Sequence, residues 1–337
     1  AGRSCAIETL ERVAGRSCET GYLHLDALKM DDYFECVSFD VIQTKTSKLK
    51  KVPIVAGSNK RNCFYLKFGD YLALRGKQLF EHKPGQPMWL FPELQRVKNA
   101  GTKIGDYMTA VLPKAQGGID RYAAVAATGL PDGISAGGIR PGCCNALNAN
   151  MPTEHSVAMT GHELKGFTSF HEYTDSTLAM CMPGAILLAG WPALPWGQLG
   201  RGPSAPSLLV LVPHGISMEL LNKTLNALFS ISSCSAPALH VGGALRSMVV
   251  MSFAAMLMYH AERLDHHEMR TSCMKLEAMV KRHMGLPANA DAREEICKWG
   301  AIVGNKFKSD NARLMGACAD NGINQMAAAL RCMGNMI

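Results

Sequence analysis

Five polar residues in the first half of the chain are of the types that handle a phosphate group. They are Arg16, Lys45, Arg140, His162 and Tyr173. Two arginines and a histidine can hold an anion, because guanidinium groups form forked hydrogen bonds with phosphate oxygens. A lysine can give a proton to a leaving oxygen, and a tyrosine can attack phosphorus once its phenol is activated. This set could exchange one phosphodiester bond for another through a phosphotyrosine, with no metal and no nucleotide cofactor.

The same residues lie in four short motifs that follow one another along the chain. The motifs are GRSCE around Arg16, TKTSKLKKVP around Lys45, GIRPG around Arg140, and TGH at His162 leading to FHEYT at Tyr173. Together they resemble the catalytic domain of tyrosine recombinases, the phage-integrase family, and are most similar to its eukaryotic crypton-like members. The resemblance covers roughly residues 6–180, and four motifs in order are far more specific than any one of them.

The resemblance implies DNA recombination or integration, by strand breaking and rejoining through a 3′-phosphotyrosine intermediate. In that mechanism Tyr173 is the nucleophile, and Arg16 and Arg140 bind the non-bridging phosphate oxygens. His162 assists at the phosphate, and Lys45 on its hairpin is the general acid for the departing 5′ oxygen. The family requires no cofactor and no metal, so none is expected here.

Further lysines on the same hairpin, Lys48, Lys50 and Lys51, are expected to contact DNA. The resemblance implies double-stranded DNA as partner, a homo-oligomer (a tetramer) on that DNA, no membrane, and an intracellular, nuclear location in a eukaryote. The chain opens almost directly on the first motif and has no initiator methionine. We therefore expect a fragment that lacks the N-terminal core-binding domain of the family.

Two departures from the family pattern leave other functions open. Gly137 occupies the position of the histidine in the second arginine motif, and the interval from His162 to Tyr173 is longer than usual. One alternative is a decayed or domesticated recombinase fold that binds DNA without cleaving it. Another is a helical interaction module in which the motifs are coincidental. Relaxation of DNA, as by a type IB topoisomerase, would use the same chemistry.

Composition fits a folded chain with a mild preference for anions. Of the 337 residues, 47% are apolar and 19% charged, and the formal net charge is +7. Disorder of the whole chain is thus excluded, while the charge alone is too small to identify a nucleic-acid-binding protein. The Pro- and Gly-rich segment 183–206 is expected to be a linker between a catalytic domain, 1–182, and a Met-rich helical C-terminal domain, 207–337.

Hydrophobic periodicity predicts a mainly α-helical protein with a small antiparallel β-hairpin or sheet, an α+β fold followed by an all-α domain. Two strands are expected between residues 35 and 54, on either side of a polar turn. The expected helices are 6–28 with interruptions at its glycines, 62–77, 93–111, 138–148, 153–160, one opening at 217, 243–264, 267–284 and 291–307.

Cysteine and histidine spacing does not predict a metal site. The twelve cysteines include no CxxC pair, so we expect buried free thiols rather than a zinc ribbon. Asp265-His266-His267-Glu268 is a cluster in sequence, but adjacent residues on a helix point in different directions, and a solvated helix start is the better interpretation. The apolar stretch 248–259 is too short to span a bilayer and is interpreted as a buried helix.

Overall fold

A computed structural model describes most of the chain and gives the positions of its helices and strands. The described residues are 2–14, 16–42, 49–80, 87–95, 102–104, 106, 136–161, 177–193, 202–231, 243–264, 269–287 and 289–315. Within them the protein is mainly helical, with one small three-stranded antiparallel sheet.

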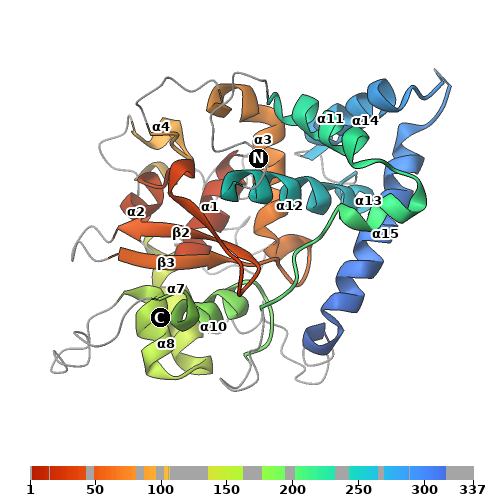
Figure 1. Ribbon diagram of the computed structural model, residues 1–337. Coiled ribbons are helices and arrows are strands. Elements are labelled where there is room, and N and C mark those ends of the chain that lie inside the picture. The colour runs from red at the N-terminus through yellow and green to blue at the C-terminus, as the bar shows by residue number, and fades with distance from the viewer. Residues whose placement is uncertain are drawn as a thin grey trace, which may run out of the picture.

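The sheet lies between two groups of helices (Figure 1). Its strands are β1 (Leu28–Asp31), β2 (Cys36–Ile42) and β3 (Leu49–Ile54), paired in that order. The two strands expected from the sequence are β2 and β3, and Phe39 lies opposite Val52 in their register. β1 was not expected, because its four residues form a short edge strand with little burial to mark it.

The helices on one side of the sheet come from distant parts of the chain. They are α1 (Gly2–Val13), α3 (Phe64–Phe80) and α12 (Ala244–Met258). On the other side, as Figure 1 shows, lie α7 (Ala136–Asn150), α8 (Thr153–Thr160) and α10 (Leu178–Leu188). Five of these helices overlap the predicted ones, whereas α10 crosses the position at which a domain was expected to end.

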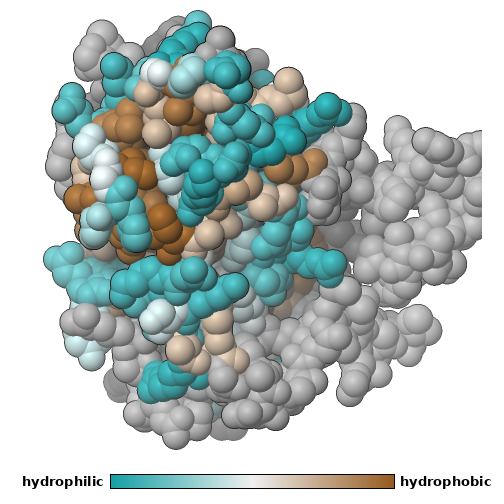
Figure 2. Space-filling view, turned by 90° about the vertical axis from the view of Figure 1, so that its right-hand side faces the viewer, coloured by the Kyte–Doolittle hydropathy of each residue, from teal (hydrophilic) through white to brown (hydrophobic). Residues whose placement is uncertain are grey.

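The remaining helices are short segments near the sheet and a layer of C-terminal helices. Near the sheet are α2 (Ser17–Gly21), α4 (Pro92–Gln95) and the 3-10 turns Leu25–Ala27 and Lys60–Asn62; the C-terminal layer has the 3-10 turn Leu209–His214, α11 (Met218–Phe229), α13 (His260–Arg263), α14 (Arg270–Met284) and α15 (Ala292–Asp310). Figure 2 shows apolar residues grouped on the outer face of this layer, bordered by hydrophilic ones. Most of the helix expected at 93–111 lies outside the described residues.

Helix α12 is the centre of the hydrophobic core. It is apolar on all sides, and Met248, Phe253 and Met256 are fully buried. It packs closely on α3 and α15, and each of those helices presents a glycine to it. A Cβ at Gly69 would approach the Met256 side chain to 2.8 Å, and one at Gly300 would approach the Leu257 carbonyl oxygen to 2.3 Å. No helix in the described part of the chain is long and apolar enough to cross a membrane.

The segment expected to link two domains belongs to this core. Residues 183–188 are the second half of α10 and not a linker. The Trp191 indole is buried, donates to the Ala56 carbonyl at 2.7 Å, and lies 6.2 Å from the Phe307 ring between centroids. The expected boundary at residue 183 therefore falls inside a helix, and residues on both sides of it share one continuous core.

Candidate functional site

Arg16 is held at the start of α2 by a buried carboxylate. Helix α1 ends at Val13, and Ala14 takes a left-handed conformation (φ 45°) that turns the chain toward Arg16. Glu19 accepts the Arg16 backbone N–H at 2.8 Å and its Nη1–H at 3.0 Å. The first bond is one half of a capping box, in which the third helical residue reaches back to the residue before the helix. Glu19 is 3% exposed, whereas the Arg16 side chain is 33% exposed, so part of the guanidinium remains open to solvent.

Arg140 extends from α7 to the end of α8. Its Nη2 donates to the Thr160 carbonyl at 3.0 Å, at the last residue of that helix. Its Nε is buried and has no hydrogen-bond acceptor among the described residues. Carbonyls at a helix C-terminus carry partial negative charge, which favours a cation there. The bond thus fixes one nitrogen of the guanidinium at the C-terminal end of α8.

Lys50 lies between the C-terminal ends of two helices. Its side chain on β3 is fully buried, and its Nζ donates to the Val13 carbonyl at 2.6 Å and to the Met159 carbonyl at 2.9 Å. These carbonyls end α1 and α8, respectively. Burial lowers the pKa of Lys50 to about 8, Glu19 partly opposes this shift, and the positive charge of Arg140 adds to it. The expected DNA contact at Lys50 is therefore corrected, because a fully buried ammonium cannot reach DNA in this fold.

These contacts bring two of the predicted phosphate ligands to one region. Met159 and Thr160 are consecutive, and their carbonyls accept from Lys50 and Arg140. Both Glu19 and Arg140 act on the Lys50 ammonium electrostatically, so Arg140 and the carboxylate that holds Arg16 lie near the same lysine. Three positive side chains thus accompany one carboxylate, and the region carries excess positive charge when Lys50 is protonated. Such a region can bind an anion.

Four other predicted site residues lie outside the described part of the chain: Lys45, Lys48, His162 and Tyr173. Their predicted roles remain predictions. His162 follows directly on Gly161, which caps α8 in a left-handed conformation (φ 64°). Lys51 is exposed on β3, as a DNA contact requires.

Two residues of this site have roles that sequence reasoning missed, although the sequence carried a signal for each. Lys50, Val52 and Ile54 alternate along β3, and residues two apart share a face of a strand, so Lys50 belongs to the buried face. Glu19 follows Arg16 by three residues, the spacing of a capping box. The spacing was recognised as part of a motif, but not as the contact that orients the arginine.

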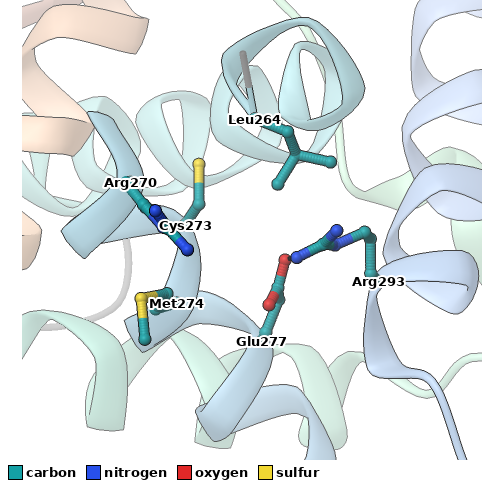
Figure 3. Close-up of a pocket in the computed structure, with 6 residues that line it drawn as sticks. All are labelled: Leu264, Arg270, Cys273, Met274, Glu277 and Arg293. Atoms are coloured by element: carbon teal, nitrogen blue, oxygen red, sulfur yellow. Dashed lines mark hydrogen bonds and ion pairs between the residues drawn. The ribbon is translucent and has the colours of Figure 1, made fainter. Parts of the chain in front are cut away.

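A concave region lies among the C-terminal helices (Figure 3). It encloses about 280 Å³ and is lined by Leu264, Arg270, Cys273, Met274, Glu277 and Arg293. Glu277 already accepts from Arg293 at 3.2 Å and lies 3.1 Å from the His260 Nε2. Arg293 thus balances its charge, and Arg270 leaves the lining with a smaller excess of positive charge than the region around Lys50.

No group of His, Cys, Asp and Glu side chains that could hold a metal ion occurs among the residues for which the structure gives positions. The cluster at residues 265–268 lies outside them. Eight cysteines are free thiols, and burial raises the pKa of several, for example that of Cys181 to about 12. Thiols with a raised pKa are poor nucleophiles at neutral pH. Comparisons with protein families, with characterised proteins and with solved structures find no match to this chain.

Proposed function

We propose that this chain is a tyrosine-type DNA recombinase, which breaks and rejoins DNA through a 3′-phosphotyrosine. The observation that carries the proposal is the arrangement of Arg16, Lys50 and Arg140 around the ends of α1 and α8. Arg16 and Arg140 are far apart in sequence, and both come from motifs that resemble the family. Each is held in place by a neighbouring group and keeps further N–H donors on its guanidinium.

The proposed phosphodiester exchange requires positive charge at the phosphate. In-line attack on a phosphodiester passes through a transition state with charge concentrated on the non-bridging oxygens, and fixed guanidinium groups stabilise it. The Tyr173 oxygen forms the new bond to phosphorus while the bond to the 5′ oxygen breaks. The phenol loses its proton to a neighbouring base, for which His162 is our proposal, and Lys45 gives a proton to the 5′ oxygen. The phosphotyrosine conserves the ester, so a 5′-hydroxyl can reverse the reaction without ATP.

A second function is favoured by one residue. Gly137 lies where the family has a histidine, so the phosphate would lack one donor. A chain that binds double-stranded DNA without cutting it would keep the positive region and lose only the chemistry. Assembly as a tetramer on DNA is part of the recombinase proposal and is not required by this alternative.

A nicked DNA duplex, on which a covalent adduct is trapped, distinguishes a recombinase from a protein that only binds DNA. The full chain is incubated with duplexes of randomised sequence, each carrying a nick a few nucleotides to the 3′ side of the possible cleavage positions. Cleavage then releases the short fragment that carries the 5′-hydroxyl, so religation fails and a covalent protein–DNA adduct accumulates. The recombinase proposal expects an adduct that survives denaturant and is enriched for particular sequences. Duplex binding with no adduct would favour the binding protein.

The matched control is Tyr173→Phe, which removes one hydroxyl. We expect it to abolish the adduct and to leave DNA affinity nearly unchanged, because the hydroxyl acts only in the chemical step. An adduct of unchanged yield would show that another tyrosine attacks, and Tyr107 and Tyr122 would be tested next.

A further inference from the structure

A buried lysine that ties two helix ends together has no role in the reaction described above. The Lys50 side chain is fully buried, and its two acceptors are backbone carbonyls, Val13 of α1 and Met159 of α8. In the sequence, one acceptor lies close to Arg16 and the other lies next to the residue that binds Arg140. Val13 precedes Arg16 by three residues, and Met159 precedes Thr160, whose carbonyl binds Arg140.

The surroundings of Lys50 include both charge and thiol groups. The groups that act on its ammonium are Glu19 from α2, Arg140 and Cys144 from α7, and Cys181 from α10. The α1 and α8 carbonyls complete the set. Burial of a charged amine is unfavourable unless strong acceptors replace water. Two helix C-termini supply such acceptors, because their carbonyls have no partner within the helix.

We propose that Lys50 is a positioning residue, which fixes Arg16 and Arg140 relative to each other by binding the ends of α1 and α8. The inference rests on the proposed function, since it assigns a purpose to the spacing of the two arginines. If the α1 end shifts, Arg16 shifts with it through the left-handed turn at Ala14. If the α8 end shifts, the Thr160 carbonyl and the guanidinium of Arg140 follow.

The test compares Lys50→Met with Lys50→Arg and with Lys29→Met. Methionine fills a similar volume but donates no hydrogen bond, whereas arginine keeps the charge and the donors. Lys29 is the control, because it lies on β1 of the same sheet, is exposed, and is not among the residues expected to contact DNA. The rate of adduct formation is measured in a single turnover at saturating DNA, so that weaker binding does not enter.

We expect Lys50→Met to slow adduct formation by about a hundredfold, since a misplacement near 1 Å can cost that much. Lys50→Arg should recover most of the rate, and Lys29→Met should form the adduct at the wild-type rate. A duplex with a methylphosphonate at the scissile position carries no charge there and depends less on the arginines. On that duplex the deficit of Lys50→Met should shrink to less than about tenfold.

Several results would overturn the inference. One is a wild-type rate for Lys50→Met. Another is a combination of three results: Lys50→Met loses the same factor in rate on the charged and the neutral duplex, its melting temperature falls, and Lys50→Arg does not recover the rate. Together these results would indicate a general loss of folding.

A second measurement does not depend on cleavage. Hydrogen exchange should quicken in Lys50→Met at residues 14–16 and 159–161 together, and in Lys29→Met at neither. If the wild-type chain forms no adduct, the proposed function fails, and this exchange pattern still decides whether Lys50 holds the two helix ends. Unchanged exchange at both ends would refute the positioning role.

Discussion

At the scale of single residues, the sequence predicted roles for Arg16 and Arg140 but did not reveal the groups that hold them. Arg16 and Arg140 were identified from short motifs, and the structure places Arg140 and the partner of Arg16 near Lys50. Motif residues are recognisable because the chemistry restricts their type. The burial of Lys50 depends on which face of β3 meets the helices, and a run of lysines suggests a solvated turn unless the alternation along the strand is considered. The roles of Lys45, His162 and Tyr173 stay predictions.

Gly137 gives a prediction at this scale. It lies three residues before Arg140 on α7, and residues three apart share a helix face. A histidine placed there would lie beside the arginine and could donate to the same phosphate. A missing donor of this kind costs about 3 kcal/mol of transition-state stabilisation, or roughly a hundredfold in rate. We expect Gly137→His to raise the single-turnover rate of adduct formation.

Gly137→Gln is the control for that substitution, because it also removes the glycine from the helix but supplies no imidazole. If histidine and glutamine change the rate equally, the effect comes from helix stability. If Gly137→His leaves the chain without cleavage activity, the decayed DNA-binding protein becomes the better description.

At the scale of elements, most helices were predicted to within a few residues. Apolar residues recur with a helical period in α11, whereas α12 was recognised by its almost continuous apolar sequence. The edge strand β1 was missed, since half of its four residues are exposed and nothing in its pattern separates it from a loop. The position at which α1 ends was not predicted, for another reason. The Val13 carbonyl at that end accepts from Lys50, a tertiary contact that local sequence does not encode.

The β2–β3 hairpin gives a prediction about DNA binding. Replacement of Lys45, Lys48 and Lys51 by glutamine should reduce the slope of log affinity against log salt by about one unit for each phosphate that the protein no longer neutralises. Lys298→Gln should leave that slope unchanged, because this exposed lysine on α15 pairs with Glu294 and is not among the residues expected to contact DNA. Fluorescence anisotropy with a labelled duplex, at several salt concentrations, measures both. A slope unaffected by the triple replacement would remove the hairpin from the interface.

The contact between α13 and α14 predicts a dependence of stability on pH. The pKa of buried His260 is lowered, first by desolvation and then by Arg263, although Glu277 opposes the shift. In the unfolded chain the imidazole has its ordinary pKa near 6.5. Below that pH the unfolded state binds a proton that the folded state does not, so stability falls as pH decreases. Above it His260 is neutral in both states and contributes no slope.

The measurement compares melting temperatures of wild type and His260→Gln between about pH 5 and pH 8. Glutamine can still donate to Glu277 but does not titrate in this range. We expect the two curves to run parallel above the ordinary histidine pKa and the wild type to lose more stability below it. His214, exposed at the end of a 3-10 turn, supplies a control: His214→Gln should follow the wild type. Parallel curves for His260→Gln throughout would contradict the lowered pKa.

At the scale of the whole molecule, the N-terminal and C-terminal parts are joined by a buried charged contact. Arg263 donates to Asp70 and, at 2.8 Å, to the Ser272 hydroxyl, and so connects α3 with α13 and α14. Composition alone predicted a boundary near residue 183, because proline and glycine are common in linkers. The apolar residues of that segment, such as Trp191, pack into the core instead, and no local pattern distinguishes the two cases.

Asp70→Ala tests how firmly the parts are joined. The substitution leaves the Arg263 guanidinium buried without its carboxylate, and breaking a buried ion pair in this way costs about 3–5 kcal/mol. The control is Asp310→Ala, which removes a partly exposed pair with Lys306 and should cost about 1 kcal/mol or less. Urea denaturation of the full chain measures both. A single transition shifted to lower urea is expected, whereas two separate transitions would show that the parts unfold independently.

The backbone carbonyls that hold Lys50 and Arg140 affect the rate at which the protein would associate with an anionic ligand. A backbone carbonyl is a dipole without net charge, so a cation that it holds keeps its full charge, whereas a carboxylate partner would cancel it. Within the described residues, Glu19 is the carboxylate that acts on Lys50. The electric field of the remaining charge extends about 8 Å into physiological salt solution. An approaching phosphate chain would be attracted before any contact forms, and encounter would slow as ionic strength rises.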